Sequence, residues 1–316
     1  MVEKNMQILA LIDDGYSIQD IRKKLDIDYK ELNTRLKQIK RAGFDFLETY
    51  MTKGNLIYAV NREIELPFED NTSTTIHFED TASNYRFLAI ADTHFGHKED
   101  SMEMINNLYN YAAANGIHNI LIAGDFIEGD FTCSKYVRNK TVPTQLSYVL
   151  KNYPYSDEIM NYILLGNHDQ HSLSYGNGLN VMKVLNQGRY DFKCLGYGQH
   201  VLKIRNVNIV LKHQLNGVNI VNPPYADLTL FGHSHVCNME LGERAFIHIP
   251  ACSNVVPGND IGNRDKYQFG ALDIDLKLKN TTTRQIDIKQ LDTSSKVKVL
   301  NSITHRLGQM KNNKRN

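Results

Sequence analysis

The chain has 316 residues, with 41% hydrophobic and 22% charged residues, a composition typical of a soluble globular protein. That length allows one large domain and one small domain. No apolar run reaches the roughly 18 residues of a membrane helix, so we expect no membrane segment. The formal net charge of +1 excludes a uniformly basic or acidic protein, but charge is unevenly distributed along the chain.

The N-terminal stretch MVEKNMQILALIDDGYS contains acids and has neither the apolar core nor the cleavage site of a signal peptide. Four cysteines (Cys133, Cys194, Cys237 and Cys252) are scattered without CxxC spacing. We therefore expect reduced thiols and a cytoplasmic location.

The first 62 residues predict three helices followed by a β-hairpin. Apolar residues recur at near-helical spacing from Met6 to Ile12. The segments SIQDIRKKL and DYKELNTRLKQIKRAG each begin at a capping residue (Ser17, Asp28) with an acid three positions later. FDFLETYM and LIYAV then flank a turn that contains glycine. This order resembles a winged helix-turn-helix module.

The third predicted helix is the most basic part of this module. Between Tyr29 and Arg41 it carries five cations and one acid, Glu31. The resemblance implies that this helix contacts a DNA groove, and the expected DNA-binding residues are Lys30, Arg35, Lys37 and Arg41. The alternative is a helical domain for packing or dimerisation whose cations are merely solvated, and a homodimer is possible.

Two segments flank the large domain that we predict over residues 85–292. Residues 63–84 are acidic and rich in Ser and Thr, which predicts a linker with one short strand in TTIHF. Residues 293–316 contain six cations and no acid, and we expect them to form a frayed tail or an arm along a polyanion.

The large domain contains five short apolar runs that end at residue types able to bind metals. The runs are RFLAIA, NILIAG, YILLG, IVLK and LTLFG, and intervening segments such as EDSMEMINNLYNYAAANG fit crossover helices. Ligands collect at the carboxyl ends of strands in α/β folds, so we expect one shared rim. The side chains delivered there are Asp92, His94, Asp125, Asn167, His213, His233 and His235.

Oxygen and imidazole donors without thiolate suit divalent ions such as Mn²⁺, Fe²⁺ or Zn²⁺. Six or seven donors exceed the needs of one ion and suffice for two. Two neighbouring ions can polarise a phosphoryl oxygen and activate water. A lone His or Asp at a strand end is more often a hydrogen-bonding residue than a ligand, but recurrence at five strand ends favours a metal site.

The sequences ADTHFGH, GDFIEGD, GNHD, KH and GHSH resemble, in order and over about residues 86–236, the five motifs of the calcineurin-like metallophosphoesterases. That resemblance implies an α/β fold with a β-sandwich flanked by helices (αββα) and a centre of two divalent ions, with Mn²⁺ favoured over Fe²⁺ or Zn²⁺.

The resemblance also implies a role for each residue of the motifs. Asp92, His94 and His235 would bind the first ion, and Asp125 would bridge the two ions. The second ion would be bound by Asn167, His213 and His233. His168 matches the family's non-ligand histidine, which steadies the transition state or protonates the leaving oxygen. We expect Asp169 to orient His168.

For four further residues the sequence gives only weaker predictions of their environment. Glu128 fits either a position behind the ligands or a solvated acid. His97 and His171 flank motifs and could contact substrate, but we favour surface histidines without such a role. Cys237 is expected to be a core residue, because the site already has its donors.

These motifs imply phosphoester hydrolysis, and the N-terminal module favours DNA as the substrate. The first motif is similar to that of double-strand-break repair nucleases, although GDFIEGD lacks the histidine typical of that branch. We expect a metal-dependent nuclease or nucleic-acid phosphodiesterase. The alternatives are a phosphatase or phosphodiesterase of a small nucleotide or phosphoprotein, and a DNA-binding regulator whose phosphoesterase domain is not catalytic.

Overall fold

The computed structural model describes residues 2–13, 16, 18–41, 45–50, 56–61, 73–75, 84–129, 136–139, 141–175, 179–215, 226–257, 261–278 and 284–308. Within residues 41–83 the description covers the backbone alone. Among the described residues, no helix has both the length and the apolar character needed to span a bilayer.

The three helices and the hairpin expected near the N-terminus are present. They are α1 (Val2–Asp13), α2 (Ile18–Leu25), α3 (Tyr29–Arg41), β1 (Asp45–Tyr50) and β2 (Leu56–Asn61), and the two strands pair antiparallel. The carboxylate of Asp28 accepts the backbone N–H of Glu31 at 2.7 Å and caps α3, as the sequence indicates. Ser17, the other expected cap, lies outside the described residues. That this module is a winged helix stays a prediction.

An aliphatic core holds the three helices together. Asp26 adopts a φ of +48° and closes α2, and the turn then buries Ile27 before α3 begins. The core residues share a helical spacing of three or four along each helix. They are Ile8, Ile12, Ile18, Ile21, Ile27, Leu32, Leu36 and Ile39. This cluster is separate from the two cores of the large domain.

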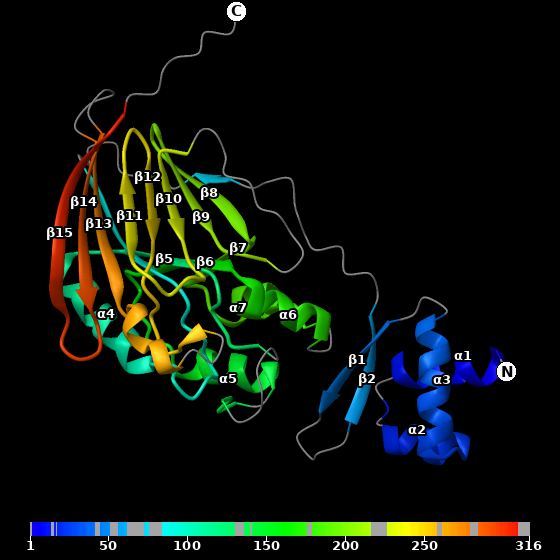
Figure 1. The fold of residues 1–316 in the computed structure, drawn as a ribbon. Coiled ribbons are helices and arrows are strands. Elements are labelled where there is room, and N and C mark those ends of the chain that lie inside the picture. The colour runs from blue at the N-terminus through cyan, green and yellow to red at the C-terminus, as the bar shows by residue number, and fades with distance from the viewer. Residues whose placement is uncertain are drawn as a thin grey trace, which may run out of the picture.

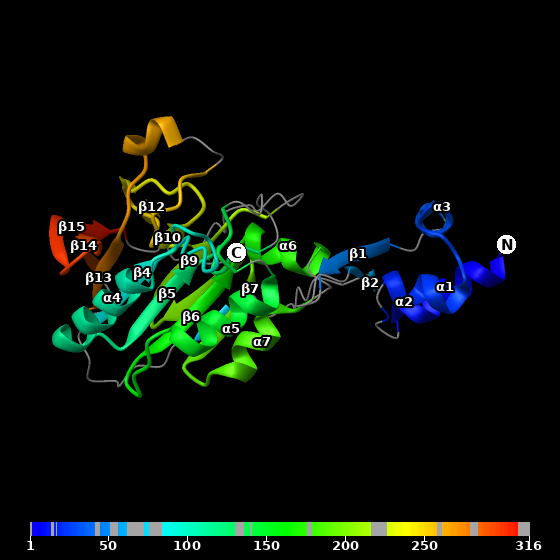
Figure 2. The same ribbon diagram turned by 90° about the horizontal axis from the view of Figure 1, so that it is seen from below.

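The large domain contains a seven-stranded sheet in the order β15-β14-β13-β4-β5-β6-β7. Strands β4 to β7 are parallel neighbours, seen side by side in Figure 2, and β13, β14 and β15 add antiparallel pairs. The bounds are β4 (Asn84–Ile90), β5 (Asn119–Ala123), β6 (Met160–Leu165), β7 (Phe192–Tyr197), β13 (Ala271–Leu278), β14 (Arg284–Asp292) and β15 (Lys298–Leu307).

A six-stranded sheet in the order β11-β12-β10-β9-β8-β3 faces the first. Strands β9, β10 and β12 are parallel neighbours. Strand β8 pairs antiparallel with β9, and β11 pairs antiparallel with β12. The bounds are β3 (Ser73–Thr75), β8 (Gln199–Ile204), β9 (Val207–Lys212), β10 (Leu228–Phe231), β11 (Asn238–Leu241) and β12 (Ala245–His248).

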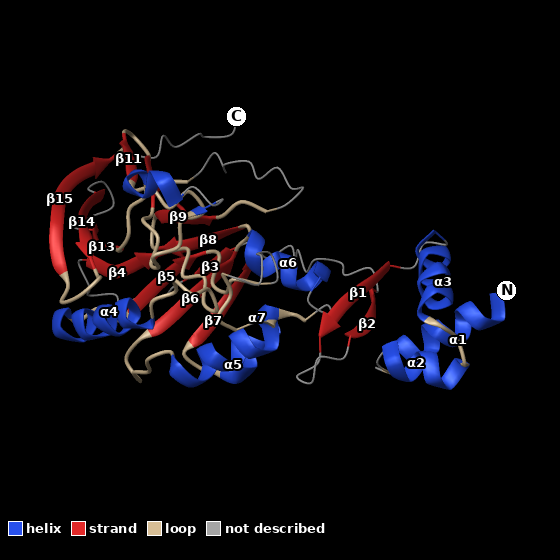
Figure 3. Ribbon diagram, turned by 60° about the horizontal axis from the view of Figure 1, so that its bottom comes forward, coloured by secondary structure: helices blue, strands red, loops and turns tan. Residues whose placement is uncertain are grey.

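Of the four described helices of the large domain, α4, α5 and α7 cover the outer face of the seven-stranded sheet (Figures 1 and 3), whereas α6 begins just after the end of β6. The four helices are α4 (Met102–Asn115), α5 (Val142–Asn152), α6 (Asn167–Tyr175) and α7 (Val181–Gly188), and a 3₁₀ segment spans Ile261–Lys266. One core lies between these helices and the sheet, and a second lies between the sheets, where Phe87, Leu121 and Leu211 meet. The predicted β-sandwich with flanking helices is confirmed.

Both boundaries of the large domain differ from the prediction. Residues 293–316 were expected to be a basic tail, but β15 pairs with β14 along the edge of the sheet. Its last residue, Leu307, is 2% exposed. The short strand predicted in the linker is present as β3, which overlaps TTIHF at Thr74 and Thr75, but it pairs parallel with β8 and so joins a sheet of the large domain. Strand β15 was missed because the basic, acid-free composition of residues 293–316 as a whole indicated a tail, and the apolar residues within β15 do not alternate strictly.

The edge strand gives the first testable prediction. Substitution of Leu307 by Ala removes a buried side chain and should lower the free energy of unfolding by about 2–4 kcal/mol. The matched control on the same strand is Leu300→Ala, whose side chain is 58% exposed, and its effect should stay within about 0.5 kcal/mol. Urea denaturation measures both. Equal effects of the two substitutions would contradict the placement of β15.

Candidate metal centre

The five predicted strand ends meet in space, although they belong to two different sheets. In the larger sheet, β4, β5 and β6 each end two residues before a predicted ligand, namely Asp92, Asp125 and Asn167. In the smaller sheet, β9 ends directly before His213 and β10 ends two residues before His233. Because the sheets pack face to face, the carboxyl ends of both converge on one rim.

Strained backbone marks the residues at this rim. Seven described non-glycine residues have positive φ, and five of them are predicted ligands, with φ between 45° and 78°. These five are Asp92, His94, Asp125, His233 and His235. Such conformations are costly for non-glycine residues and persist where the surroundings impose them, which is common at functional sites.

Three glycines make room for His213 at the centre of the site. A Cβ on Gly124, which has φ +90°, would lie 2.2 Å from the His213 ring, and one on Gly232 would lie 2.8 Å from it. A Cβ on Gly166 would lie 2.4 Å from Asp125 Oδ1. A side chain at any of these three positions would displace a candidate ligand, so the site requires glycine there.

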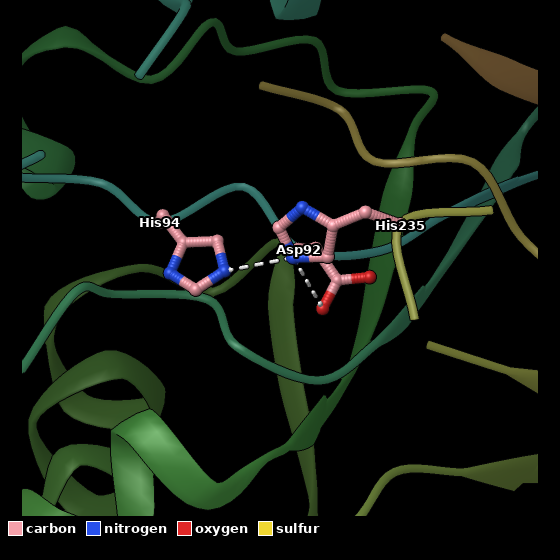
Figure 4. Close-up of side chains that lie close together, drawn as sticks. All are labelled: Asp92, His94 and His235. Atoms are coloured by element: carbon pink, nitrogen blue, oxygen red, sulfur yellow. Dashed lines mark hydrogen bonds and ion pairs between the residues drawn. The ribbon is translucent and has the colours of Figure 1, made fainter. Parts of the chain in front are cut away.

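The first group of candidate ligands is Asp92, His94 and His235, all of them buried (Figure 4). His94 Nε2 lies 3.3 Å from His235 Nε2, which lies 3.6 Å from Asp92 Oδ1. These are the separations expected of donor atoms that share one ion at about 2.0–2.2 Å.

Hydrogen bonds on the outer nitrogens fix which ring atoms face the site. His235 Nδ1 lies 2.8 Å from the carbonyl oxygen of Val255, and His94 Nδ1 lies 2.8 Å from Glu128 Oε2. A carbonyl or an ionised carboxylate only accepts, so both Nδ1 atoms carry protons and both Nε2 lone pairs point at each other. A proton or a metal cation must lie between them. A hydrogen-bond acceptor on the ring nitrogen that faces away from the ion is typical of metal-binding histidines.

The second group is Asp125, His213 and His233, joined by Asn167. His213 Nδ1 lies 3.0 Å from the Gln214 carbonyl oxygen, so its Nε2 lone pair faces Asp125 Oδ2 at 3.4 Å. His233 Nδ1 lies 3.1 Å from Asn167 Oδ1.

The two carboxylates lie between the groups. Asp125 Oδ2 is 3.4 Å from His213 Nε2 and 3.8 Å from His94 Nε2, so it faces both groups, as a bridging ligand must. Asp92 Oδ1 is also close to His213, at 3.1 Å from Nε2. All seven residues named as ligands from the sequence therefore lie together. Their oxygen and imidazole donors fit two borderline divalent ions.

The charges of this cluster shift the pKa values of its members. Burial opposes the charge on His94, but the hydrogen bond to Glu128 and the nearby carboxylates outweigh burial and raise its pKa to about 9. Burial likewise opposes the charge on His213, and Asp125 and Asp92 raise its pKa to about 9. Despite burial, the surrounding histidines lower the pKa of Asp125. In the absence of bound ions, the protons held by His94 and His213 therefore balance the negative charges of the Asp92 and Asp125 carboxylates.

His168 is held at this rim by Glu128. The Nδ1 of His168 lies 2.8 Å from the carbonyl oxygen of Glu128, which leaves Nε2 on the side of Asp125, 4.0 Å from its Oδ2. Glu128 is 1% exposed and its carboxylate contacts His94. The open alternative for Glu128 is thereby decided: it lies behind the ligands and is not a solvated acid.

The expectation that Asp169 orients His168 is wrong. The Asp169 carboxylate is fully buried and accepts the backbone N–H groups of Phe126, Ile127 and Gly166 at 2.8–3.0 Å. Asp169 therefore fastens the loop after β5 to the end of β6. Burial and the charge of Asp125 raise its pKa to about 7, against the lowering effect of these hydrogen bonds.

Three residues near the motifs also have definite places. His97 is 8% exposed, so the expectation of a surface histidine is wrong for it. His171 is half-buried, and burial lowers its pKa to about 4. Cys237 is half-buried and packs against the core between the sheets, as expected.

The cations predicted to contact DNA do not share one environment. Lys30 and Lys37 are exposed on α3. Arg35 is 17% exposed at its side chain, and its guanidinium donates to Glu31 Oε1 at 2.7 and 2.9 Å and to Asn5 Oδ1 at 3.3 Å. Arg35 therefore ties α3 to α1, and its contact with DNA stays a prediction. The side chain of Arg41 lies outside the described residues.

Residues 85–237 match the family model for calcineurin-like phosphoesterases, almost the range that the five motifs cover. The chain contains a calcineurin-like phosphoesterase domain. This family consists of metal-dependent phosphoester hydrolases, which agrees with the two groups of clustered donors. No curated protein matches the chain.

Several solved structures resemble the phosphoesterase domain. A predicted phosphoesterase from Streptococcus pneumoniae is 12% identical, with 71% of this chain and 99% of that chain covered and a TM-score of 0.35. A purple acid phosphatase from yellow lupin is 9% identical (83% and 59% covered, TM-score 0.46). The nuclease MPE from Pseudomonas putida is 13% identical (74% and 98% covered, TM-score 0.33). Identities and TM-scores this low carry no inference about substrate.

Metal binding to the phosphoesterase domain should release protons. At pH 7 His94 and His213 hold protons in the metal-free protein, because their pKa values are raised to about 9. Ions must displace these protons, so affinity should rise with pH up to about 9, with about two protons released at pH 7. Titration calorimetry in buffers of different ionisation enthalpy counts the protons. The exposed His118→Asn variant should give the same count, and the absence of release would refute the assignment.

Glu128 should affect metal affinity without touching an ion. Glu128→Gln keeps the size of the side chain but removes the negative charge beside His94 Nδ1, and Mn²⁺ affinity should fall about 10–100-fold. Calorimetric titration with Mn²⁺ measures the change. Glu103→Gln, an exposed acid on α4, is the matched control. Unchanged affinity in Glu128→Gln would mean that this carboxylate does not support the ligand.

Proposed function

We propose that the chain is a divalent-metal-dependent phosphodiesterase that acts on DNA. The observation that carries this proposal is the covalent linkage of an exposed cationic helix face to a phosphoester-hydrolysing domain. On α3, Leu32, Leu36 and Ile39 are buried, whereas Lys30 and Lys37 are exposed. Residues 30 and 37 are two helical turns apart and lie on the same side of α3.

This arrangement suits a nucleic acid better than a small phosphoester. Helices α2 and α3 are separated by the short turn 26–28, as in helix-turn-helix modules, whose second helix enters the major groove. Lysines that neutralise phosphates add affinity by releasing counterions, independently of base sequence. Binding of DNA by this module would raise the local concentration of scissile phosphodiesters at the hydrolytic domain.

In the proposed mechanism, Asp92, His94 and His235 hold one divalent ion and Asn167, His213 and His233 hold the other, with Asp125 shared. When bound, such ions polarise phosphoryl oxygens and acidify water. The residues of the chain then position and move protons. The backbone N–H of His168 donates to Asp125 Oδ1 at 2.9 Å and fixes this carboxylate.

His168 is the proposed proton donor to the leaving oxygen. Because its Nδ1 is engaged with the Glu128 carbonyl, Nε2 is the atom available to hold a proton on the side of the metal ligands. Asp169 takes no part in proton transfer, since backbone amides occupy both of its oxygens. Its role is to hold the loops that carry Asp125 and His168.

The proposal is tested with full-length protein, Mn²⁺ and four substrates: single- and double-stranded DNA, bis-p-nitrophenyl phosphate and p-nitrophenyl phosphate. We expect hydrolysis of DNA and of the diester, and loss of both in Asp125→Asn. Hydrolysis of the monoester alone would support a phosphatase. Binding of duplex without turnover of any substrate would support a regulator.

The contribution of α3 is tested separately. Lys30→Ala/Lys37→Ala should weaken duplex binding and reduce the slope of log affinity against log salt by about 2, because two phosphate contacts are lost. The activity of this double variant on bis-p-nitrophenyl phosphate should equal that of the wild type. The matched control removes two exposed lysines of the large domain, Lys183 and Lys203. Equal salt slopes in both double variants would remove α3 from the DNA-binding surface.

A further inference from the structure

The loop that follows the ligand His94 carries an aromatic and cationic surface with no role in the hydrolytic site described above. It consists of His97, Lys98, Tyr136 and Arg138, and we call these four residues the shelf. His97 ends the first motif and Lys98 follows it, whereas Tyr136 and Arg138 come from a segment about forty residues later.

Backbone hydrogen bonds fasten the two segments of the shelf together. The N–H of Lys98 donates to the Tyr136 carbonyl at 2.8 Å, and the N–H of Arg138 donates to the Gly96 carbonyl at 2.7 Å. Gly96 has φ +104°, and a Cβ there would lie 2.4 Å from Gln145 Cγ, so the loop is tightly packed. The shelf is therefore preorganised and does not need to fold on binding.

Its aromatic part is a parallel pair of rings. The Tyr136 and His97 rings lie 6.1 Å apart between centroids with an interplanar angle of 10°. His97 is buried, and its Nδ1 accepts the N–H of Glu99 at 3.0 Å, which fixes the orientation of the imidazole. Tyr136 is half-buried, so part of this residue is in contact with solvent.

Its charged part is formed by two exposed cations. Lys98 is exposed, and the Arg138 side chain is 46% exposed. Two contacts fix the Arg138 guanidinium. Its Nη1 lies 3.0 Å from the Asp100 carboxylate, and its Nη2 donates to the Lys98 carbonyl at 3.0 Å. Glu99 is the one exposed acid within residues 97–100. An anion near Lys98 and Arg138 would meet one guanidinium that is already fixed in place and one exposed ammonium group.

The shelf is linked directly to the candidate metal centre. The N–H of His97 donates to the carbonyl of the ligand His94 at 3.0 Å, and the N–H of Glu128 donates to the Phe95 carbonyl at 3.0 Å. Glu128 also holds His168 through its own carbonyl. The shelf therefore lies beside the metal centre, close to Glu128 and His168.

We propose that the shelf binds the nucleotide next to the scissile phosphodiester in a single-stranded segment, with its base stacked on Tyr136 and its phosphate near Lys98 and Arg138. The inference rests on the proposed phosphodiesterase function and adds a subsite to it. Aromatic rings combined with cations along the backbone are how proteins hold single strands without sequence preference. A paired base in a duplex stays stacked within the helix and does not offer its face.

The test measures KM and kcat of the full chain with Mn²⁺ on a single-stranded oligothymidylate and on bis-p-nitrophenyl phosphate. Tyr136→Leu should raise KM for the oligonucleotide about tenfold by removing the stacking surface. Tyr136→Phe, which keeps the ring, should retain the wild-type KM. Lys98→Ala should raise KM and reduce its salt dependence by about one unit of slope. None of the three should alter kcat/KM for the small diester.

The controls and the contrary outcomes separate the subsite from the proposed function. Tyr190→Leu and Lys183→Ala change exposed residues of the same types elsewhere on the domain and should leave every parameter unchanged. If the wild type cleaves the oligonucleotide and the shelf variants keep its KM, the subsite is refuted while the proposed function stands. Equal losses on both substrates would mean that the loop only supports the metal centre, which also refutes the subsite. A wild type that hydrolyses only the small ester would refute the proposed function, and the subsite with it.

Discussion

Two buried carboxylates, Asp92 and Asp125, lie within 4 Å of imidazole nitrogens that face inwards, and the rest of the phosphoesterase domain depends on this concentration of donors. Charges buried without compensation would destabilise the fold by several kcal/mol, so positive charge must be present at the site. Backbone carbonyls already occupy the outer nitrogens of His213 and His235. The inward nitrogens are therefore left for protons or for divalent ions, and this is the property that a hydrolytic metal centre requires.

The architecture places these donors by joining two sheets. Each sheet delivers its ligands at the carboxyl ends of parallel strands, and packing of the sheets against each other brings Asp92, Asp125 and Asn167 opposite His213 and His233. Because the ligands come from both sheets, the centre exists only when both cores are formed. The left-handed backbone at five ligand positions shows that the surrounding structure imposes the geometry of the site, since these residues would not adopt it alone.

Glu128 and Asp169 illustrate two uses of buried acids beside the same centre. Glu128 directs its carboxylate at the ligand His94 and its carbonyl at His168, so one residue fixes the orientation of a ligand and of the proposed proton donor. Asp169 directs both oxygens at backbone amides and holds the loops in register. The proposed single-strand subsite continues this pattern, because its rings and cations are anchored to the backbone that carries His94.

The sequence by itself determined the chemical identity of the centre, because ligand type and strand-end position are local properties: an apolar run followed by Asp, Asn or His can be recognised without knowing its neighbours. It also determined the N-cap of α3, which depends on the spacing of Asp28 and Glu31 along one segment. Only the tertiary structure decided which partner each polar group meets. Glu128 turned out to support His94, Asp169 to bind backbone and Arg35 to bond Glu31 and Asn5, and the basic strand β15 completed a sheet. These outcomes depend on contacts between segments far apart in the chain, and local composition does not encode such contacts.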